Sequence, residues 1–476
     1  MCGARHREQS CGPANRGGGG GVTVPRKSNL GVFSLSWPIF LQLTCTYVMG
    51  LVDVWTLGRI SDDAAGAVGS VSTLVTFVLM MFSFMGQGGS LVYARSLGEG
   101  RTTKVQEYYF VALLLHIALG VVVGAMLYVF AEDAARLMGL DGRLLSYGTT
   151  FLEVVAAGAL LHSVMAMLGG AMAANGFTLQ AMFAAVLTNI VNIVLIYVLV
   201  LSPSGTRWGV QGVALSTVLA TMVGLLYSVR LVFFRIGITF RRPASARDLW
   251  AHGALLMTFT LPTMLEPAFW QAAQIATTRI IAAVGTDELS ARMYTLSITN
   301  MIGMFSSALS QGLQISLGHL AGAGDLDGIR RRAHGAHLAG SAIALALALV
   351  TASCGGWVMG WFTSDPQVID AGKLLLWCGL LYLPGSALIM TTASTLRAVG
   401  HVTYPAAVGI LVLWGVFVPL AYLLSLPFGL AILGVMIAMA VDENLRALLL
   451  TVRWRYLSAP ERAHRIVKQP ETDPVA

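Results

Sequence analysis

Charged residues are scarce in this chain. Only 11% of its 476 residues are Asp, Glu, Lys or Arg, whereas about 25% are charged in ordinary soluble domains; 56% are hydrophobic and the mean hydropathy is +0.73. This composition excludes an ordinary soluble protein and indicates an integral membrane protein. The alternation of apolar and polar residues that marks a transmembrane β-barrel is also missing, so we expect packed helices.

Motifs for disulfides, metal binding and catalysis are missing from the sequence. The five cysteines have no CxxC spacing, so neither a disulfide framework nor a zinc site is predicted. No HExxH motif, no pair of membrane aspartates at metal-ligand spacing and no Ser/His cluster on adjacent spans is visible. We therefore expect no enzyme and no cofactor. A membrane-embedded enzyme stays open as an alternative, which activity in a detergent extract without an ion gradient would support.

Apolar runs of about 20 residues recur along the chain, and each is long enough to cross a hydrocarbon core of about 30 Å. We predict an all-α integral membrane protein with twelve transmembrane helices. Most of the 30 Lys and Arg residues fall on one side of these spans, which places both termini in the cytoplasm. The predicted spans are 32–56, 64–89, 107–130, 147–169, 178–201, 210–233, 254–284, 290–317, 335–362, 370–394, 404–426 and 429–452.

The two halves of the sequence repeat each other. A shift of 224 positions aligns them without a gap, placing Pro38 on Pro262 and GQGGSLVYARSLGEG (86–100) on SQGLQISLGHLAGAG (310–324). Six spans per half is an even number, so both halves enter the membrane in the same direction. They should therefore form two six-helix lobes related by a pseudo-two-fold axis along the membrane normal, with the transport pathway between them.

The expected division of the chain follows from this repeat and from composition. The glycine-rich start lacks the apolar residues needed for a packed core, so it is predicted to be a flexible cytoplasmic tail, followed by a retained first span rather than a cleaved signal peptide. The basic linker FRIGITFRRPASARD joins the lobes. The predicted parts are a tail (1–30), an N-lobe (31–240), a C-lobe (241–455) and a second cytoplasmic tail (456–476).

One acid interrupts the first span. Gln42, Thr46, Gly50 and Asp53 follow one another at steps of four, four and three, which places them on one helical stripe. A charged aspartate facing lipid is penalised by about 2.5–3.5 kcal/mol, so this stripe should face protein or water. Span five offers two amides, Asn189 and Asn192, at comparable depth in the same lobe.

A second acid, Glu266, lies in span seven. Trp270 follows it by one turn, and an aromatic ring beside an acid suits an organic cation. The alternative for Asp53 and Glu266 is a purely structural role, in which each acid hydrogen-bonds a neighbouring helix. Asp442 and Arg446 in span twelve are spaced for local neutralisation, and we expect a structural role for them.

The sequence resembles the multidrug and toxic compound extrusion (MATE) family from about residue 30 to 455. The resemblance is carried by SLSWPIFLQ, GLVDVWTLGRISDDAAGAVG, GQGGSLVYARSLGEG, the ANG turn before span five and STLRAVG before span eleven. It implies two six-helix lobes in a V shape that open alternately to either side. It also implies export of organic cations in exchange for protons or sodium ions.

The resemblance maps Asp53 and Glu266 onto acids of the family. It also shows two departures: Ile196 stands where the fifth span commonly has Asp or Asn, and Ser386 stands where some branches have a tenth-span aspartate, one turn after Tyr382. Both remove oxygen ligands that sodium prefers, so proton coupling is favoured and sodium coupling stays open. The coupling candidates are Asp53, Glu266, Asn189 and Asn192; the substrate-binding candidates are Gln42, Thr46, Trp270, Asn300, Tyr382 and Ser386.

We therefore expect a secondary active antiporter in the cytoplasmic (inner) membrane that exports small organic cations. Its partners should be these cations and membrane lipids, and we expect a monomer. No binding to nucleic acid is expected, because the basic residues behind the net charge of +7 gather at the ends of the spans. A flippase for lipid-linked precursors is the other transport alternative, but its cavity should be lined by cations.

Overall fold

The computed structural model describes residues 31–202, 208–282 and 286–459, and helices account for nearly all of them. The predictions for the tails fall almost wholly outside these residues. The first half contains α1 (Val32–Ile60), α2 (Asp62–Gly98), α3 (Thr102–Val129), α4 (Ala131–Leu137), α5 (Gly142–Ala174), α6 (Thr178–Ile196), η1 (Tyr197–Leu201), α7 (Gly209–Leu231) and η2 (Val232–Ile236). The second contains α8 (Ala246–Ala282), α9 (Thr286–Ala323), α10 (Leu326–Ser353), α11 (Gly355–Met359), α12 (Pro366–Ala398), α13 (Thr403–Val412), η3 (Leu413–Phe417), α14 (Val418–Ser425) and α15 (Ala431–Ser458).

The expected twelve spans are present, six in each half, with η1, η2 and η3 continuing the helices beside them. Within the described residues, nine of the spans are long and apolar enough to cross a membrane by length and composition. The other three are α8, α9 and α15, which are equally long but carry the charged side chains Glu266, Arg292 and Glu443. The polar interior of the protein is thus concentrated in the second half.

Three of the predicted boundaries were wrong in informative ways. Span nine does not run to residue 362, because the helix ends at Ser353, before the pair Gly355 and Gly356, and the short α11 follows. The repeated glycine-rich segments are not loops but the last turns of α2 and α9, which extend to Gly98 and Ala323. These extensions lie where the two halves of the molecule meet.

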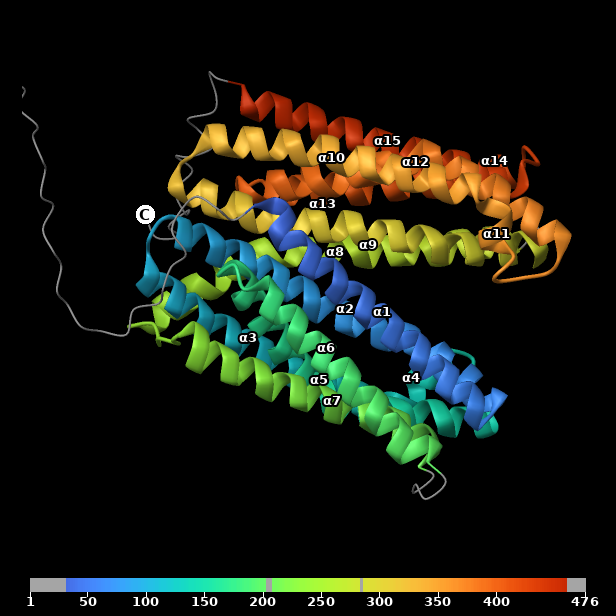
Figure 1. Cartoon of the computed structure of the whole chain (residues 1–476), viewed down its shortest axis with the longest axis horizontal. Coiled ribbons are helices and arrows are strands. Elements are labelled where there is room, and N and C mark those ends of the chain that lie inside the picture. The colour runs from blue at the N-terminus through green and yellow to red at the C-terminus, as the bar shows by residue number, and fades with distance from the viewer. Residues whose placement is uncertain (1–30, 203–207, 283–285, 460–476) are drawn as a thin grey trace, which may run out of the picture.

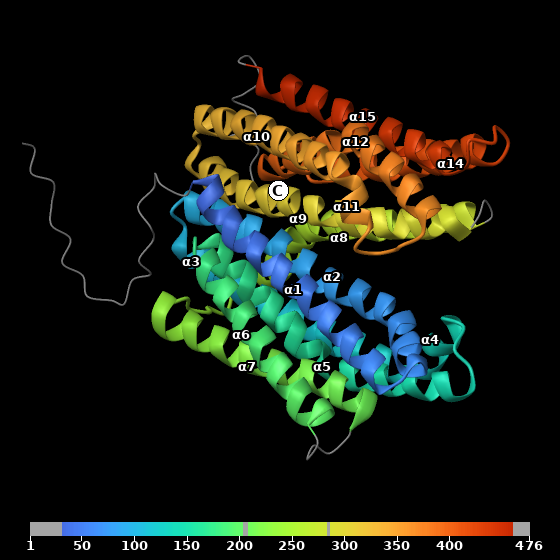
Figure 2. The same ribbon diagram turned by 45° about the vertical axis from the view of Figure 1, so that its right-hand side comes forward.

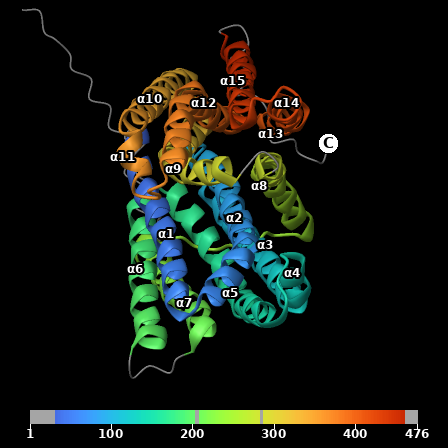
Figure 3. The same ribbon diagram turned by 90° about the vertical axis from the view of Figure 1, so that its right-hand side faces the viewer.

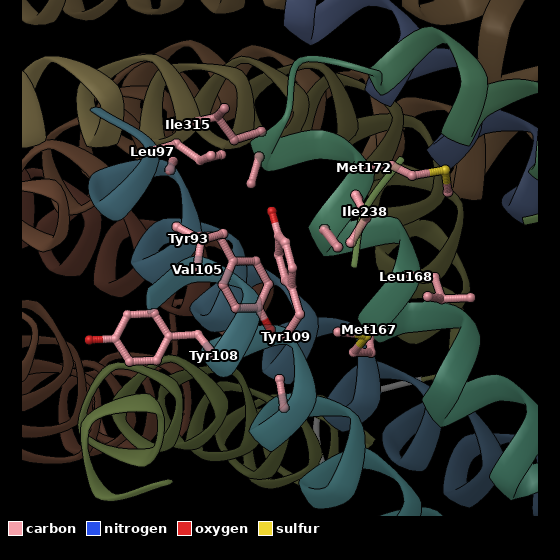
Figure 4. Close-up of a cluster of buried hydrophobic side chains, with 14 of the residues drawn as sticks. Tyr93, Leu97, Val105, Tyr108, Tyr109, Met167, Leu168, Met172, Ile238 and Ile315 are labelled. Atoms are coloured by element: carbon pink, nitrogen blue, oxygen red, sulfur yellow. The ribbon is translucent and has the colours of Figure 1, made fainter. Parts of the chain in front are cut away.

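The helices form two bundles, with α1 to α7 in one and α8 to α15 in the other (Figures 1, 2 and 3). The ribbons lie together at the end where α15 finishes and separate toward the end that carries α4 and α11 (Figure 1). Buried side chains agree with this picture. One apolar cluster at the joined end combines Leu97 of α2 with Ile315 of α9 (Figure 4), whereas the clusters toward the other end draw on one bundle each.

The joined end is built from reciprocal contacts between the repeats. Gly98 of α2 lies against the carbonyl oxygen of His319, and Gly322 of α9 lies against the carbonyl oxygen of Arg95, so closely that an added Cβ would overlap either oxygen. Each residue of one pair is the counterpart of a residue of the other at the shift of 224 positions. A two-fold relation between the halves requires this exchange of partners, so the duplication predicted from sequence is confirmed.

Two further contacts obey the same relation. Gly88 packs against Thr260 of α8, and Gly312 packs against Ser36 of α1, the counterpart of Thr260. Ala94 faces its own counterpart, Gly318, whose added Cβ would stand 2.9 Å from the Ala94 Cβ. A residue that meets its own counterpart lies on the symmetry axis, so the axis passes between α2 and α9 at this pair.

Candidate functional site

Asp53 occupies the part of α1 that lies beyond the joined end. Its side chain is half-buried, and its Oδ1 atom is buried without a hydrogen-bond partner among the described residues. One turn further on, Leu57 packs with Val210 and Val213 of α7 in a small apolar cluster, which fixes the depth of this part of α1. Asp53 is therefore a carboxylate inside a membrane span without a cationic partner in the described chain.

The amides predicted to accompany Asp53 lie on α6, and α1 packs against that helix. Asn192 is fully buried and its Nδ2 donates to Thr217 Oγ1 of α7 at 3.1 Å, one turn from Val213. Its Oδ1 has no partner among the described residues, and neither has Asn189 Nδ2. Buried polar atoms are rarely left unpaired, so this part of the N-lobe suits a bound proton, water or cation.

The second predicted acid is paired. Glu266 Oε2 accepts a hydrogen bond from Arg397 Nη2 of α12 at 2.6 Å, and the two side chains are only 18% and 16% exposed. Gly409 of α13 allows the approach, because an added Cβ there would stand 3.3 Å from the Glu266 side chain. Arg397 lies beyond residue 394, the predicted end of span ten. It lies in the last turn of α12, and this pairing was missed.

Span twelve contributes a buried charge cluster. Arg446 donates to Asp442 through Nε, at 3.1 Å to Oδ1, and through Nη2, and it also donates to Glu443 Oε1 at 3.0 Å. The expected pairing of Asp442 with Arg446 is confirmed. Glu443, which interrupts span twelve beside Asp442, is only 5% exposed and lies beside the Ser386 side chain.

The remaining candidates are dispersed over both lobes. Gln42 is half-buried, and Thr46 is exposed and donates to the Gln42 carbonyl in its own helix at 3.0 Å. In the C-lobe, Trp270 packs at the margin of the apolar core, whereas Asn300 is exposed. Tyr382 is buried in α12 and lies beside Thr299 of α9, which is also buried, whereas Asn300 points away from the interior of this lobe.

One functional candidate was missed entirely. Arg292, near the start of α9, is 2% exposed and donates to Thr278 Oγ1 at 2.8 Å, Thr277 Oγ1 at 3.0 Å and Gln274 Oε1 at 3.2 Å. No carboxylate pairs with it among the described residues. Thr277 is the counterpart of Asp53 at the shift of 224 positions. The same region of the two lobes thus holds an unpaired acid in one and an arginine bound only by neutral groups in the other.

Comparison with known proteins accounts for the duplicated architecture. The profile of the MatE family matches residues 38–198 and 262–423, one segment in each lobe. The chain belongs to the MatE family. It is 28% identical to the uncharacterized transporter YisQ of Bacillus subtilis (strain 168), over 90% of this chain and 95% of that one. It is 22% identical to the probable multidrug resistance protein NorM of Thermotoga maritima, over 88% and 90%.

Solved structures of MATE transporters share the fold. A MATE transporter in a bent conformation superimposes with a TM-score of 0.84 at 18% identity, covering 91% of this chain and 96% of that one. An outward-facing multidrug resistance MATE transporter gives a TM-score of 0.83 at 18% identity, covering 90% and 95%. The expected architecture of twelve spans in two lobes is therefore confirmed, and the protein is a multi-pass membrane transporter of the MATE type.

Proposed function

We propose that this MATE protein is an antiporter that exports organic cations across the cytoplasmic membrane in exchange for protons, with Asp53 as the coupling carboxylate. The observation that carries the proposal is the buried Oδ1 atom of Asp53, which has no hydrogen-bond partner among the described residues. A carboxylate in this position attracts a lipophilic cation when ionised and releases it when protonated. Competition of cargo and proton for one negative charge couples their movements in opposite directions.

The neighbours of Asp53 favour a proton over sodium as the coupling ion. Sodium needs several oxygen ligands, and one lone pair of the Thr217 hydroxyl is already occupied by the hydrogen bond from Asn192. Ile196, one turn after Asn192, contributes no oxygen. A proton requires only the carboxylate and a route to water. Sodium coupling is the second candidate, supported by the free Oδ1 of Asn192.

Transport requires that the lobes also part at the end where they now meet. If both termini lie in the cytoplasm, as the distribution of basic residues predicts, the described arrangement is closed to the cytoplasm and faces outward. Proton binding to Asp53 then shifts the equilibrium between the two arrangements only through its different affinity for each. The flippase alternative finds less support, because Arg397 and Arg446 in the C-lobe are both paired with carboxylates.

Ethidium efflux from proteoliposomes tests the proposal under a proton gradient and, separately, under a sodium gradient. We expect the proton gradient to drive efflux by the wild type, and Asp53→Asn to abolish it because the amide cannot change charge. Asp133→Asn is the matched control, since Asp133 is exposed outside the predicted spans. Efflux driven by sodium alone contradicts the choice of ion, and full activity of Asp53→Asn contradicts the choice of residue.

A further inference from the structure

The C-lobe contains a group of ionisable side chains whose charges do not balance. Three carboxylates, Glu266, Asp442 and Glu443, lie with two guanidinium groups, Arg397 and Arg446. Asp442, Glu443 and Arg446 are 2%, 5% and 6% exposed. If every group is ionised, the formal charge is −3 plus +2, which leaves −1. An unbalanced charge buried in a membrane protein is costly, so a proton or another cation must accompany this group.

The hydrogen bonds single out Glu443 among the three acids. Asp442 receives two bonds from Arg446, one to each oxygen, and Glu266 holds Arg397 at 2.6 Å. Glu443 receives only one bond, 3.0 Å long, from the Arg446 Nη2 atom that also serves Asp442. Its other described neighbour is the neutral side chain of Ser386, which adds no charge.

The helices around Glu443 supply no further positive charge. On α12 it faces Ser386 and Tyr382, both neutral, and on α8 the nearest ionisable group is Glu266, another acid. Neither α13 nor α14 presents a charged side chain to it within the described residues. Arg292 lies beyond Tyr382 and is occupied by Thr277, Thr278 and Gln274. The balance has to come from an added cation.

We propose that Glu443 carries an exchangeable proton, so that the C-lobe holds a proton site on α15 in addition to the one proposed at Asp53. The exchange of this proton during transport rests on the proposed function, whereas its presence in the resting protein does not.

Infrared spectroscopy of the purified protein in lipid nanodiscs tests for this proton directly. In Asp53→Asn, where the N-lobe acid is removed, we expect a carbonyl band of a protonated carboxyl at neutral pH, and we expect its loss in Asp53→Asn/Glu443→Gln. Carbon-13 labelling of glutamate should shift the band, and labelling of aspartate should not. In Asp53→Asn/Glu443→Asp the remaining band should follow the aspartate label instead. Glu132→Gln, in an exposed acid of α4, is the matched control and should leave the band unchanged.

The outcomes separate this inference from the proposed function. Absence of the band in Asp53→Asn, or its persistence after Glu443→Gln, overturns the inference even if wild-type ethidium efflux is normal. In Asp53→Asn, whose C-lobe is unchanged, a band that shifts with the aspartate label places the proton on Asp442. That result also overturns the inference. Conversely, a glutamate band in a protein that moves no ethidium supports the site at Glu443 and counts against the proposed antiport. If the Glu443 variants do not fold, isotope labelling of Asp53→Asn still tests the inference. A band that does not shift with labelled glutamate overturns it.

Discussion

The contacts of Gly98 and Gly322 allow a quantitative test of how the lobes close. Each glycine faces a backbone carbonyl oxygen of the opposite lobe, that of His319 or Arg95, and a backbone atom cannot rotate away as a side chain can. An alanine at either position therefore forces α2 and α9 apart at their crossing. Overpacking of this kind costs about 1–3 kcal/mol, and every 1.4 kcal/mol is about tenfold in an equilibrium. A single substitution should thus disfavour the described arrangement by about 5- to 150-fold.

Spin labels measure this shift. One label at Thr103 and one at Arg331, both exposed and near the joined end in opposite lobes, report the distance between the lobes by double electron–electron resonance. We expect Gly98→Ala and Gly322→Ala to transfer population from the short distance to a longer one. Gly66→Ala on α2 and Gly303→Ala on α9 are matched controls, because an added Cβ meets nothing within 4 Å there.

If Gly98→Ala and Gly322→Ala leave the distance distribution like that of the controls, the helix crossing tolerates a methyl group and does not limit closure. If the controls shift as much as the test variants, the effect belongs to glycine replacement in general. Substitution at Gly98 and Gly322 together need not be additive, because the two contacts share one crossing.

Three further predictions concern stability, read from thermal unfolding in detergent. Arg397→Gln leaves Glu266 without its cation and should destabilise by about 3 kcal/mol, the lower end of the range for a broken buried pair; Arg397→Gln/Glu266→Gln should recover much of the loss, and a double variant no better than the single one contradicts the pairing. Arg292→Lys should cost about 1.5–3 kcal/mol for each hydrogen bond that the ammonium cannot replace, and unchanged stability would show that the fork of donors is not needed. Ser61→Ala removes the hydroxyl that accepts from the Ala64 N–H at 3.0 Å and should cost about 1 kcal/mol, with Ser61→Asn, a comparable cap, close to the wild type.

The sequence was sufficient to predict the lobed architecture because the membrane leaves few choices. Apolar length defines the spans, and the ungapped shift of 224 positions implies the two-fold relation that Ala94 and Gly318 then display. The same reasoning identified Asp53, since an acid in an apolar span stands out against its neighbours. The predicted spans for α2 and α9 were too short, because a helix that packs on another helix can continue past the end of its apolar run.

The partners of the charged side chains could not be predicted in the same way. Glu443 meets Ser386, and Glu266 meets Arg397, across helices whose relative rotation depends on packing of the whole lobe. Spacing along one helix reveals the pair Asp442 and Arg446, but contacts between helices carry no spacing rule. A charged residue near a predicted boundary, such as Arg397, is therefore easily assigned to a loop when it lies in a last helical turn.

The reciprocal glycine contacts make the joined end resemble the interface of a symmetric homodimer, in which one patch meets a copy of itself. Such a surface is self-complementary even though a single polypeptide now carries both copies. Each half of the chain produced alone would expose most of a face shaped to receive its own kind, although two N-terminal halves would bring Ala94 too close to a second Ala94. Separately expressed halves should therefore pair either with each other or with copies of themselves. The covalent linker favours the pairing of the two different halves.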